Sequence, residues 1–503
     1  MTLLLERGPR LLMRTDQPAQ VWAGVDVGTQ SLRVVLVDDT GRVAGHGAGS
    51  LTSHRAGAVH EQDPAQWWAV LGSAFRQALK DVDPRAVLGV AICGTSGTFL
   101  LADAVAGTPL TPALMYDDAR ASAEAPDVTA ALGHATQPSW ALPKLVHLLR
   151  TGPAPLRAGL ESGHVRMVHC PDHLAERLVG GPVATDWSHA LKTGYDLDEL
   201  DWPTGALGRL GLSPAVLPAV VRPGTPLGTV SASGADHTGL PVGTPVLAGM
   251  SDGCAAQIAA GALAPGSWNS VLGTTLVLKG VTATRIVDPA NVIYSHRHPD
   301  GGWLPGGASS VGAGILERRF PSGDRDALDR AAARYEPSGG IAYPLAGRGE
   351  RFPFFAPDAE GFELGTPVDE ADRYAAVLQG VAFVERLAYS TLRHLGADVD
   401  GPLSATGGAV RSRYWTQLRA DILGRPIRLP ASPEPAFGMA VLAAAGKDGL
   451  HATSRHFVRI AETVDPRPGS AERFADAYGG FVDELADRGH LEPDLARYAK
   501  EQP

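Results

Sequence analysis

At 503 residues the chain is too long for one ordinary domain, so we expect two or more. Its hydrophobic content of 44% is ordinary for a globular protein, and no apolar stretch reaches the length of a membrane span, which argues against a membrane partner. The net charge of −10 and the lack of any run of lysine and arginine argue against nucleic acid as a partner, because non-specific binding needs a basic surface.

The cysteines and the N-terminal residues indicate in which cellular compartment the protein is expected. Cys93, Cys170 and Cys254 are far apart and form no CxxC pair or metal-ligand spacing, which is typical of a reduced, cytoplasmic protein. Charged residues interrupt the apolar ones near the start, so residues 1–20 lack the continuous apolar core of a signal peptide. We predict a disordered extension there.

Three β runs open the fold, at 21–27, 32–37 and 43–51, and the bend Gly28-Thr29-Gln30-Ser31 joins the first two as a hairpin. A glycine at the bend lets backbone N–H groups approach an anion. Asp26, just before the bend, is a carboxylate that can hold a hydrated Mg²⁺. The stretch alone fits an edge hairpin with a buried aspartate equally well.

A helix and a buried strand complete the first sheet. Asp63 and Pro64 predict a helix start, and residues 87–92 read as a buried strand. The order of three strands, helix and strand is the ribonuclease-H-like plan. The small polar segment 94–98 follows the buried strand, at a strand end where ligands bind in α/β sheets.

The middle of the chain, from about 125 to 240, is predicted to be mostly helical. Within it, residues 185–190 form a polar island, which we interpret as helix capping rather than as the lining of a cleft. Near residue 243 the pattern restarts with a strand, 243–250. The turn Ser251-Asp252-Gly253 then caps a small-residue helix, 254–261.

The opening hairpin has a counterpart at 268–278, where Gly273 and Thr274 again form a bend between two apolar runs. An internal duplication explains this, and a chance match is the alternative. Two such hairpins that face each other are able to hold one polyphosphate. A third glycine bend, Gly407-Gly408, lies between a strand and a helix and lets a flat group approach the backbone.

Three further segments follow the counterpart hairpin. We predict a helix over 378–395 that ends at Gly396, and a small-residue helix over 437–446. From about 456 to 503 the chain is polar with weak helical periodicity, which predicts a peripheral helix and tail.

Phosphoryl transfer depends on positioning of the phosphates and neutralisation of their charge. Glycine bends at strand ends, two of them with an aspartate beside them, are suited to both tasks. The chain has no Walker motif, no protein-kinase motif set, no GxSxG and no HExxH. The sequence thus favours a phosphotransferase of another architecture.

The chain resembles the FGGY family of carbohydrate kinases, within the actin-like, sugar-kinase and heat-shock ATPase superfamily, over roughly residues 20 to 490. The matching segments are GVDVGTQSLRVVLVD, HEQDPAQWW, LAGMSDGCAAQIAAGA, SVLGTTLVL, GERFPFFAPDAEG, LQGVAFVERLAY and ATGGAVRSRYWTQLRADILGRPI. The resemblance implies an α/β fold of two ribonuclease-H-like domains around a central cleft. It implies an N-terminal domain over 21–262, a C-terminal domain that binds ATP over 263–455, and the tail.

The resemblance also implies roles for single residues. Asp252 becomes the general base that takes the sugar proton, and Asp26 and Asp252 become the ligands of Mg²⁺ and the groups that orient the sugar. A plain helix cap is the alternative for Asp252. The residues implied to bind ATP are Gly28, Thr29 and Gln30 at the first bend, Gly273 and Thr274 at the second, and Gly407, Gly408 and Arg411 at the third.

The sugar pocket departs from that of typical xylulose kinases, which carry an SGQMHG-like run where this chain reads GTSGTF at 94–99. The pattern is closer to the plant and cyanobacterial enzymes that resemble D-ribulose kinases. Ser96 becomes a donor to a sugar hydroxyl, and Asp118 becomes either a second sugar contact or a helix cap.

The resemblance thus implies an ATP- and Mg²⁺-dependent kinase, a monomer or homodimer, that acts on the terminal hydroxyl of a small ketose. D-ribulose is the first candidate, and D-xylulose, L-ribulose or a polyol are alternatives. Two alternatives belong to other functional classes. One is a non-catalytic sensor of sugar or nucleotide, and the other is an actin-like filament protein.

Overall fold

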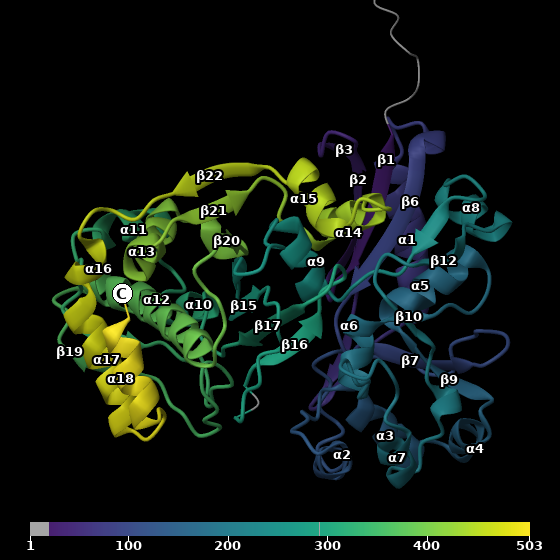
Figure 1. The fold of residues 1–503 in the computed structure, drawn as a ribbon, viewed down its shortest axis with the longest axis horizontal. Helices are drawn as coiled ribbons and strands as arrows, with labels where there is room; N and C mark the ends of the chain where they lie inside the picture. The colour runs from purple at the N-terminus through teal and green to yellow at the C-terminus, as the bar shows by residue number, and fades with distance from the viewer. Residues whose placement is uncertain (1–19, 291, 503) are drawn as a thin grey trace, which may run out of the picture.

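The computed structural model describes residues 20–290 and 292–502. Two large mixed sheets, of six and seven strands, occupy the two halves of the molecule (Figure 1). The disordered extension is predicted over residues 1–20, and residues 1–19 lie outside the described part of the chain.

The first sheet has the order β12-β13-β6-β1-β2-β3. Its strands are β1 (Val21–Val27), β2 (Ser31–Asp38), β3 (Val43–Ser50), β6 (Val87–Gly94), β12 (Pro226–Thr229) and β13 (Pro245–Leu247). β1 and β2 form the predicted hairpin, with Val27 opposite Leu32, and β1 runs parallel to β6. The two central strands are almost continuously apolar because both of their faces are buried.

The second sheet has the order β16-β17-β15-β14-β20-β21-β22. Its strands are β14 (Trp268–Leu272), β15 (Leu276–Gly280), β16 (Tyr294–Arg297), β17 (Trp303–Ala308), β20 (Leu403–Thr406), β21 (Ile427–Pro430) and β22 (Ile460–Val464). The antiparallel pair β14–β15 and the parallel pair β14–β20 repeat the arrangement of β1, β2 and β6. The predicted ribonuclease-H-like plan is therefore present twice.

Smaller sheets and helices surround these two. A five-stranded sheet contains β4 (His54–Ala56), β5 (Val59–Gln62), β8 (Ala113–Leu114), β7 (Phe99–Asp103) and β9 (Val165–His169). Two-stranded pairs are formed by β10 (Thr185–Asp186) with β11 (Val220–Val221) and by β18 (Gly340–Tyr343) with β19 (Phe362–Gly365). The middle of the chain is mostly helical, as predicted, with α2 (Ala125–Leu132), α3 (Ala141–Thr151), α4 (Ala154–Ser162), α5 (Cys170–Val179), α6 (Trp187–Ala190), the 3-10 turn η2 (Leu191–Thr193), α7 (Thr204–Arg209) and α8 (Ala232–Thr238).

Helix α1 (Pro64–Ala78) begins where the sequence predicts. The Asp63 carboxylate accepts a hydrogen bond from the Ala65 N–H at 2.9 Å, and Pro64 occupies the first helical position, where no N–H is needed. α1 covers β2 and β3, and Trp67, Leu71 and Phe75 are fully buried against the sheet.

The remaining helices are α9 (Asp252–Ala259), α10 (Gly314–Arg319), α11 (Arg325–Ala332), α12 (Glu370–His394), the 3-10 turn η4 (Gly408–Arg411), α13 (Arg413–Leu423), α14 (Pro435–Ala444), α15 (Leu450–Phe457), α16 (Ser470–Arg473), α17 (Ala475–Asp487) and α18 (Pro493–Glu501). Among the described residues, no helix combines the length and the apolar character of a membrane span.

Helix α14 comes from the second half of the sequence but packs on the first sheet (Figure 1). A Cβ on Gly24 of β1 would lie 1.7 Å from the Ala436 carbonyl oxygen, and a Cβ on Gly438 would lie 2.1 Å from that of Ala255 in α9. Only glycine allows such close approaches. The small residues of α14 thus let it fit between β1 and α9. The predicted domain limits at 262 and 455 stay predictions.

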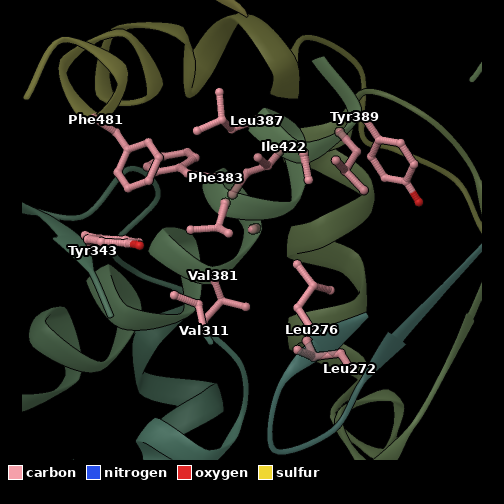
Figure 2. Packing of buried hydrophobic residues seen from close by; sticks show 14 of the residues in the cluster. Leu272, Leu276, Val311, Tyr343, Val381, Phe383, Leu387, Tyr389, Ile422 and Phe481 are labelled. Atoms are coloured by element: carbon pink, nitrogen blue, oxygen red, sulfur yellow. The ribbon is translucent and has the colours of Figure 1, made fainter. Parts of the chain in front are cut away.

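Helix α12 is the centre of the second hydrophobic core (Figure 2). It begins at Glu370, well before the predicted start at 378, because Asp369 accepts a hydrogen bond from the Asp372 N–H at 2.8 Å and caps it there. Its Val381 and Phe383 are buried on opposite sides of the helix, and Leu387 is buried on the side of Phe383, which is expected when other elements cover the helix all round.

The C-terminal segment is not peripheral, in contrast to the prediction. In α17, Tyr478, Phe481 and Leu485 are fully buried, and Phe481 packs against Tyr343 and Phe383 (Figure 2). The apolar residues recur every three or four positions, so one face of a polar helix joins the core.

A buried ion pair ties α12 to α13. Nε of Arg419 donates to one oxygen of Glu385 at 2.7 Å, and a terminal nitrogen donates to the other at 2.9 Å. Arg419 also donates to the hydroxyl of Ser270 in β14 at 2.8 Å, and both charged side chains are almost completely buried. The pair therefore links two helices to the central strand.

Candidate active site

The ends of three parallel strands meet at one edge of the first sheet. Val27 at the end of β1 lies opposite Gly94 at the end of β6, and Gly94 forms a bridge with Ser251 just before α9. This brings together the bend 28–31, the segment 94–98 and Asp252. Carboxyl ends of parallel strands are the usual ligand site in α/β sheets.

Asp26 lies on β1, one residue before the strand ends, and only 5% of its surface is exposed. Burial and the nearby charge of Asp252 raise the pKa of Asp26 to about 7, while Arg33, whose guanidinium is 3.8 Å away, lowers it. The two aspartates of the sequence prediction therefore lie within electrostatic range of each other.

Asp252 is the first residue of α9, and Ser251 occupies the cap position. The interpretation of Asp252 as a plain cap is thus not what the structure shows. Burial raises the pKa of Asp252, while the hydrogen bond from the Gly253 N–H and the charges of Lys192 and His189 lower it. These groups favour the carboxylate form that a general base needs.

Each of the first two glycine bends is closed by a hydrogen bond from its glycine N–H, and the second bend is one residue shorter than the first. The Gly28 N–H donates to the Ser31 carbonyl at 3.1 Å, and the Gly273 N–H donates to the Thr275 carbonyl at 3.1 Å. Because these two N–H groups are used within the turns, the predicted contacts to phosphate would have to come from neighbouring residues of each bend, such as Thr29 and Thr274.

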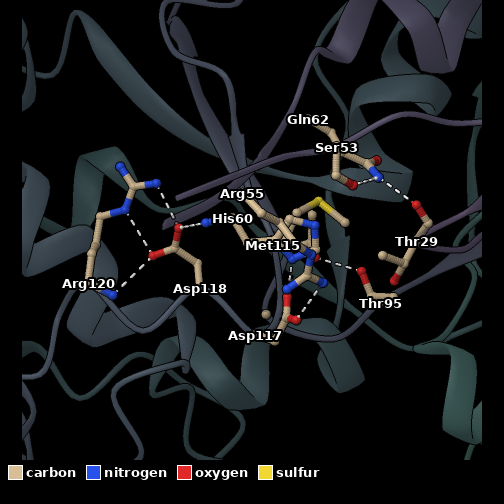
Figure 3. A network of polar contacts seen from close by, with 12 residues as sticks. Thr29, Ser53, Arg55, His60, Gln62, Thr95, Met115, Asp117, Asp118 and Arg120 are labelled. Atoms are coloured by element: carbon tan, nitrogen blue, oxygen red, sulfur yellow. Dashed lines mark hydrogen bonds and ion pairs between the residues drawn. The ribbon is translucent and has the colours of Figure 1, made fainter. Parts of the chain in front are cut away.

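Gln62 fixes the first bend, a role that the sequence prediction missed. Its amide donates to the carbonyl of Thr29 at 2.6 Å and to the hydroxyl of Ser53 at 2.9 Å (Figure 3). The Trp67 indole donates to Gln62 in turn. Gln30 is exposed, and its carbonyl accepts a hydrogen bond from the Leu51 N–H.

The third bend lies beside the second. Gly407 follows β20 with φ of +91°, and a Cβ there would lie 2.5 Å from the Leu272 carbonyl oxygen at the end of β14. The position therefore requires glycine. Arg411 is exposed, with a guanidinium nitrogen 3.5 Å from the place of a Cβ on Gly408. These groups lie at the end of β20, beside the end of β14, and their binding of adenosine stays a prediction.

Of the two predicted sugar contacts, Ser96 fits and Asp118 does not. The Ser96 hydroxyl is buried and has no hydrogen-bond partner among the described residues. The carboxylate of Asp118 is fully buried and accepts hydrogen bonds from the His60 N–H and from Arg120 (Figure 3). Asp118 anchors a turn, so the prediction that it binds sugar is corrected.

The polar island at 185–190 caps a helix, as predicted, and also faces the site. Asp186 accepts hydrogen bonds from the N–H groups of Ser188 and His189 at the start of α6, and from the His189 ring at 2.5 Å. That carboxylate raises the pKa of His189 to about 9, against the effect of burial. The Asp186 carboxylate thus favours the protonated form of His189, and the charge on His189 in turn lowers the pKa of Asp252. His189 is far from Asp252 in the sequence, so no motif indicated that the two side chains lie close together.

A magnesium ion fits these residues. Mg²⁺ is usually held by one or two carboxylates together with water and substrate phosphates, which Asp26 and Asp252 can supply with ATP. Within the described residues no group of three or more histidine, cysteine or acidic side chains forms a metal site, so a site made by protein alone is not present.

Lys144 in α3 holds the segment 94–98 and the segment around Met115 together. Its ammonium donates to the carbonyl oxygens of Gly97 at 2.8 Å and Met115 at 2.6 Å, and the side chain is completely buried. Burial lowers the pKa of Lys144 to about 7, although the nearby Asp118 raises it.

We expect this lysine to make stability depend on pH. Between about pH 7 and pH 10 the unfolded chain binds a proton at Lys144 that the folded chain does not, so its contribution to the free energy of unfolding rises with pH by up to about 1.4 kcal/mol per unit. The difference between wild type and Lys144→Met, measured by chemical denaturation, should grow across this window. The exposed control Lys80→Met should show no such trend, and a constant difference for Lys144→Met would contradict the prediction.

Comparison with known proteins agrees with this geometry. The N-terminal domain of the FGGY family of carbohydrate kinases matches residues 21–259, and the C-terminal domain of that family matches residues 268–446. The xylulose kinase of Streptomyces rubiginosus is 32% identical over 84% of this chain and 87% of its own length. That of Escherichia coli K12 is 27% identical over 84% of this chain and 89% of its own.

Solved structures agree as well. The xylulose kinase from Rhodospirillum rubrum superposes with a TM-score of 0.83 at 25% identity, covering 95% of this chain and all of the other. The two-domain α/β fold expected from the sequence is thereby confirmed. The chain belongs to the FGGY family of carbohydrate kinases and is an ATP-dependent sugar kinase.

Proposed function

We propose that the protein transfers the γ-phosphate of ATP to the terminal hydroxyl of a small ketose. The observation that carries this is the meeting of Asp26 and Asp252 at the edge of the first sheet, beside the bend at 28–31. Asp252 acts as the general base, and Asp26 orients the sugar. A bound Mg²⁺, held by Asp26 and Asp252, supplies neutralisation of phosphate charge.

The proposed step is an in-line displacement. The sugar oxygen forms a bond to the γ-phosphorus, while the bond from that phosphorus to the bridging oxygen breaks and ADP leaves with the electron pair. Asp252 takes the hydroxyl proton. The bends at 28–31 and 273–275 position the phosphates, and the bend at 407–411 seats the adenosine. Closure of the two halves would exclude water, which otherwise competes as acceptor.

Two observations favour different sugars. The segment 94–99 lacks the histidine of typical xylulose kinases and its Ser96 hydroxyl is free to donate, which supports D-ribulose. The names of relatives such as the Streptomyces rubiginosus enzyme support D-xylulose. We keep D-ribulose as the first candidate and D-xylulose as the second.

A coupled assay of ADP release over a panel of ketoses and polyols tests the proposal. We expect turnover of ketopentoses, with kcat/KM for D-ribulose above that for D-xylulose. The reverse order would reject D-ribulose and retain the kinase. A protein that binds ATP and sugars without releasing ADP would instead be a sensor, and light scattering that rises with ATP would indicate a filament.

A further inference from the structure

A cavity lies where the two halves of the molecule join, apart from the candidate active site. Its volume is about 360 Å³, which is within the range of small-molecule pockets. Its wall comes from the link between α9 and β14, from strands β20 and β21, and from the segment 451–460, which belongs to α15 and the start of β22. Neither Asp26 nor Asp252 is part of this wall, so the cavity has no role in the chemistry proposed above.

The cavity is at the opposite end of the second sheet from the bends at 273–275 and 407–411. Ser267 of the wall precedes β14 and Pro402 precedes β20, whereas the two bends follow these strands. With five residues, β14 is about 17 Å long. A ligand in the cavity would therefore be separate from ATP held at the bends.

Three basic side chains line the cavity, and no aspartate or glutamate is among the described residues of its wall. The basic residues are Arg428 of β21 and His451 and Arg455 of α15. Because α15 packs on α14, which covers the first sheet, and β21 belongs to the second sheet, the two arginines come from different halves (Figure 1). In a chain with a net charge of −10, this local excess of positive charge favours an anion.

Both guanidinium groups are available to a ligand. Within residues 20–290 and 292–502, neither Arg428 nor Arg455 forms a hydrogen bond or an ion pair through its side chain. Arg455 is in the last turn of α15, where a cation also stabilises the helix. Arg428 lies in a strand, opposite Ser404 of β20, and has no such role. Helix stability alone therefore does not explain the pair.

The polar groups of the wall are suited to an acceptor-rich ligand. The Ser404 hydroxyl donates to the Ala260 carbonyl at 2.9 Å, and the Gln257 amide donates to that of Ala262 at 2.6 Å, so these two acceptors are already used. The Ser454 hydroxyl forms no hydrogen bond with any described residue, although the residue is only 2% exposed. A buried donor without an acceptor is rare in a native protein, and a ligand oxygen would satisfy it.

We propose that this cavity binds the phosphate group of a small phosphorylated metabolite, with Arg428 and Arg455 on the phosphate oxygens and the Ser454 hydroxyl beside them. Arginine is well matched to phosphate, because its planar guanidinium donates two parallel hydrogen bonds. The cavity is large enough for a short carbon chain in addition to the phosphate. A dianion bound here links the two halves on the side opposite the bends.

The test measures binding of glycerol 3-phosphate by calorimetry, with the candidate active site filled by the preferred sugar and a non-hydrolysable analogue of ATP. We expect one bound molecule per chain. In the double variant Arg428→Gln/Arg455→Gln the dissociation constant should rise about 10- to 100-fold, the scale of a hydrogen bond to a charged group. Both arginines are exposed, so this variant should fold and keep its turnover of sugar. Arg157→Gln, at an exposed arginine of α4, is the matched control and should bind like the wild type.

Two further ligands show what the site recognises. Glycerol should not bind, and binding as tight as that of glycerol 3-phosphate would overturn the role of the phosphate. Inorganic phosphate should bind more weakly than the ester, and equal or tighter binding would assign the site to free phosphate and overturn the metabolite.

The remaining outcomes concern the place of the site. Lack of binding to the wild type, or equal binding to the wild type and the double variant, would overturn the assignment. Binding that disappears when sugar and nucleotide fill the candidate active site would place the ester there and overturn it as well. Absence of turnover with every sugar would reject the proposed function alone, because the arginines lie outside the catalytic scheme and their effect on binding is measured without turnover.

Discussion

Asp252→Ala is expected to lower kcat by about 10²-fold or more, the scale of losing a general base, while ATP binding remains. Asp252 is the carboxylate at the amino end of α9 and lies outside the bends at 28–31 and 273–275, which we propose position the phosphates. The loss should appear in kcat rather than in the KM for ATP, and Asp252→Asn should behave in the same way because the amide cannot accept the proton. Steady-state ADP release measures the effect.

A matched control is Asp83, whose carboxylate caps the 3-10 turn Pro84–Ala86 just before β6, at the opposite end of that strand from Gly94. Asp83→Asn should retain nearly normal turnover. Calorimetric titration with ATP separates loss of chemistry from loss of binding in Asp252→Ala. Near-normal turnover in Asp252→Ala would refute the base assignment and return Asp252 to a structural role.

Glu385→Gln is expected to lower the free energy of unfolding by about 3–5 kcal/mol, the usual cost of leaving one member of a buried ion pair unpaired. Arg419 would keep its charge in a site where it is only 1% exposed, with Ser270 as its remaining partner. The volume of the side chain hardly changes, so the effect isolates charge from packing. Urea denaturation followed by circular dichroism measures it.

The chain offers a control with the same geometry at the surface. Arg413 and Glu462 also form two parallel hydrogen bonds, each of 3.0 Å, but the arginine is 83% exposed. Glu462→Gln should cost at most about 1 kcal/mol. If both variants lose equal stability, burial is not what makes the Glu385 pair important.

Much of the fold followed from local sequence patterns. The valine-rich runs around Gly28 and the cap at Asp63 are short-range signals, and both elements formed as predicted. The burial of α17 did not follow, because it depends on contacts with distant segments. The start of α12 is set by the local cap at Asp369, a signal that the prediction missed. In α17, three aromatic or leucine positions in a polar helix gain meaning only when Tyr343 and Phe383 pack on them.

The candidate site, too, could be predicted from the sequence only in part. Asp26 and Asp252 stand beside glycine turns, so their sequence context indicated phosphate chemistry, whereas the role of Asp118 depended on Arg120 and the His60 backbone. Lys192 and Lys279 gave no signal. They come from separate halves of the sequence, and only the fold brings them toward the same carboxylate.

The position of α14 has a consequence for synthesis on the ribosome. One face of the first sheet stays uncovered until residues 435–444 have been made, because Gly24 is fitted to a helix encoded far downstream. Residues 260 to 444 take about 10–40 s at ~5–20 residues per second. During that interval the nascent N-terminal half exposes apolar strand surface, which makes it a natural client of chaperones and a poor candidate for expression as a separate fragment.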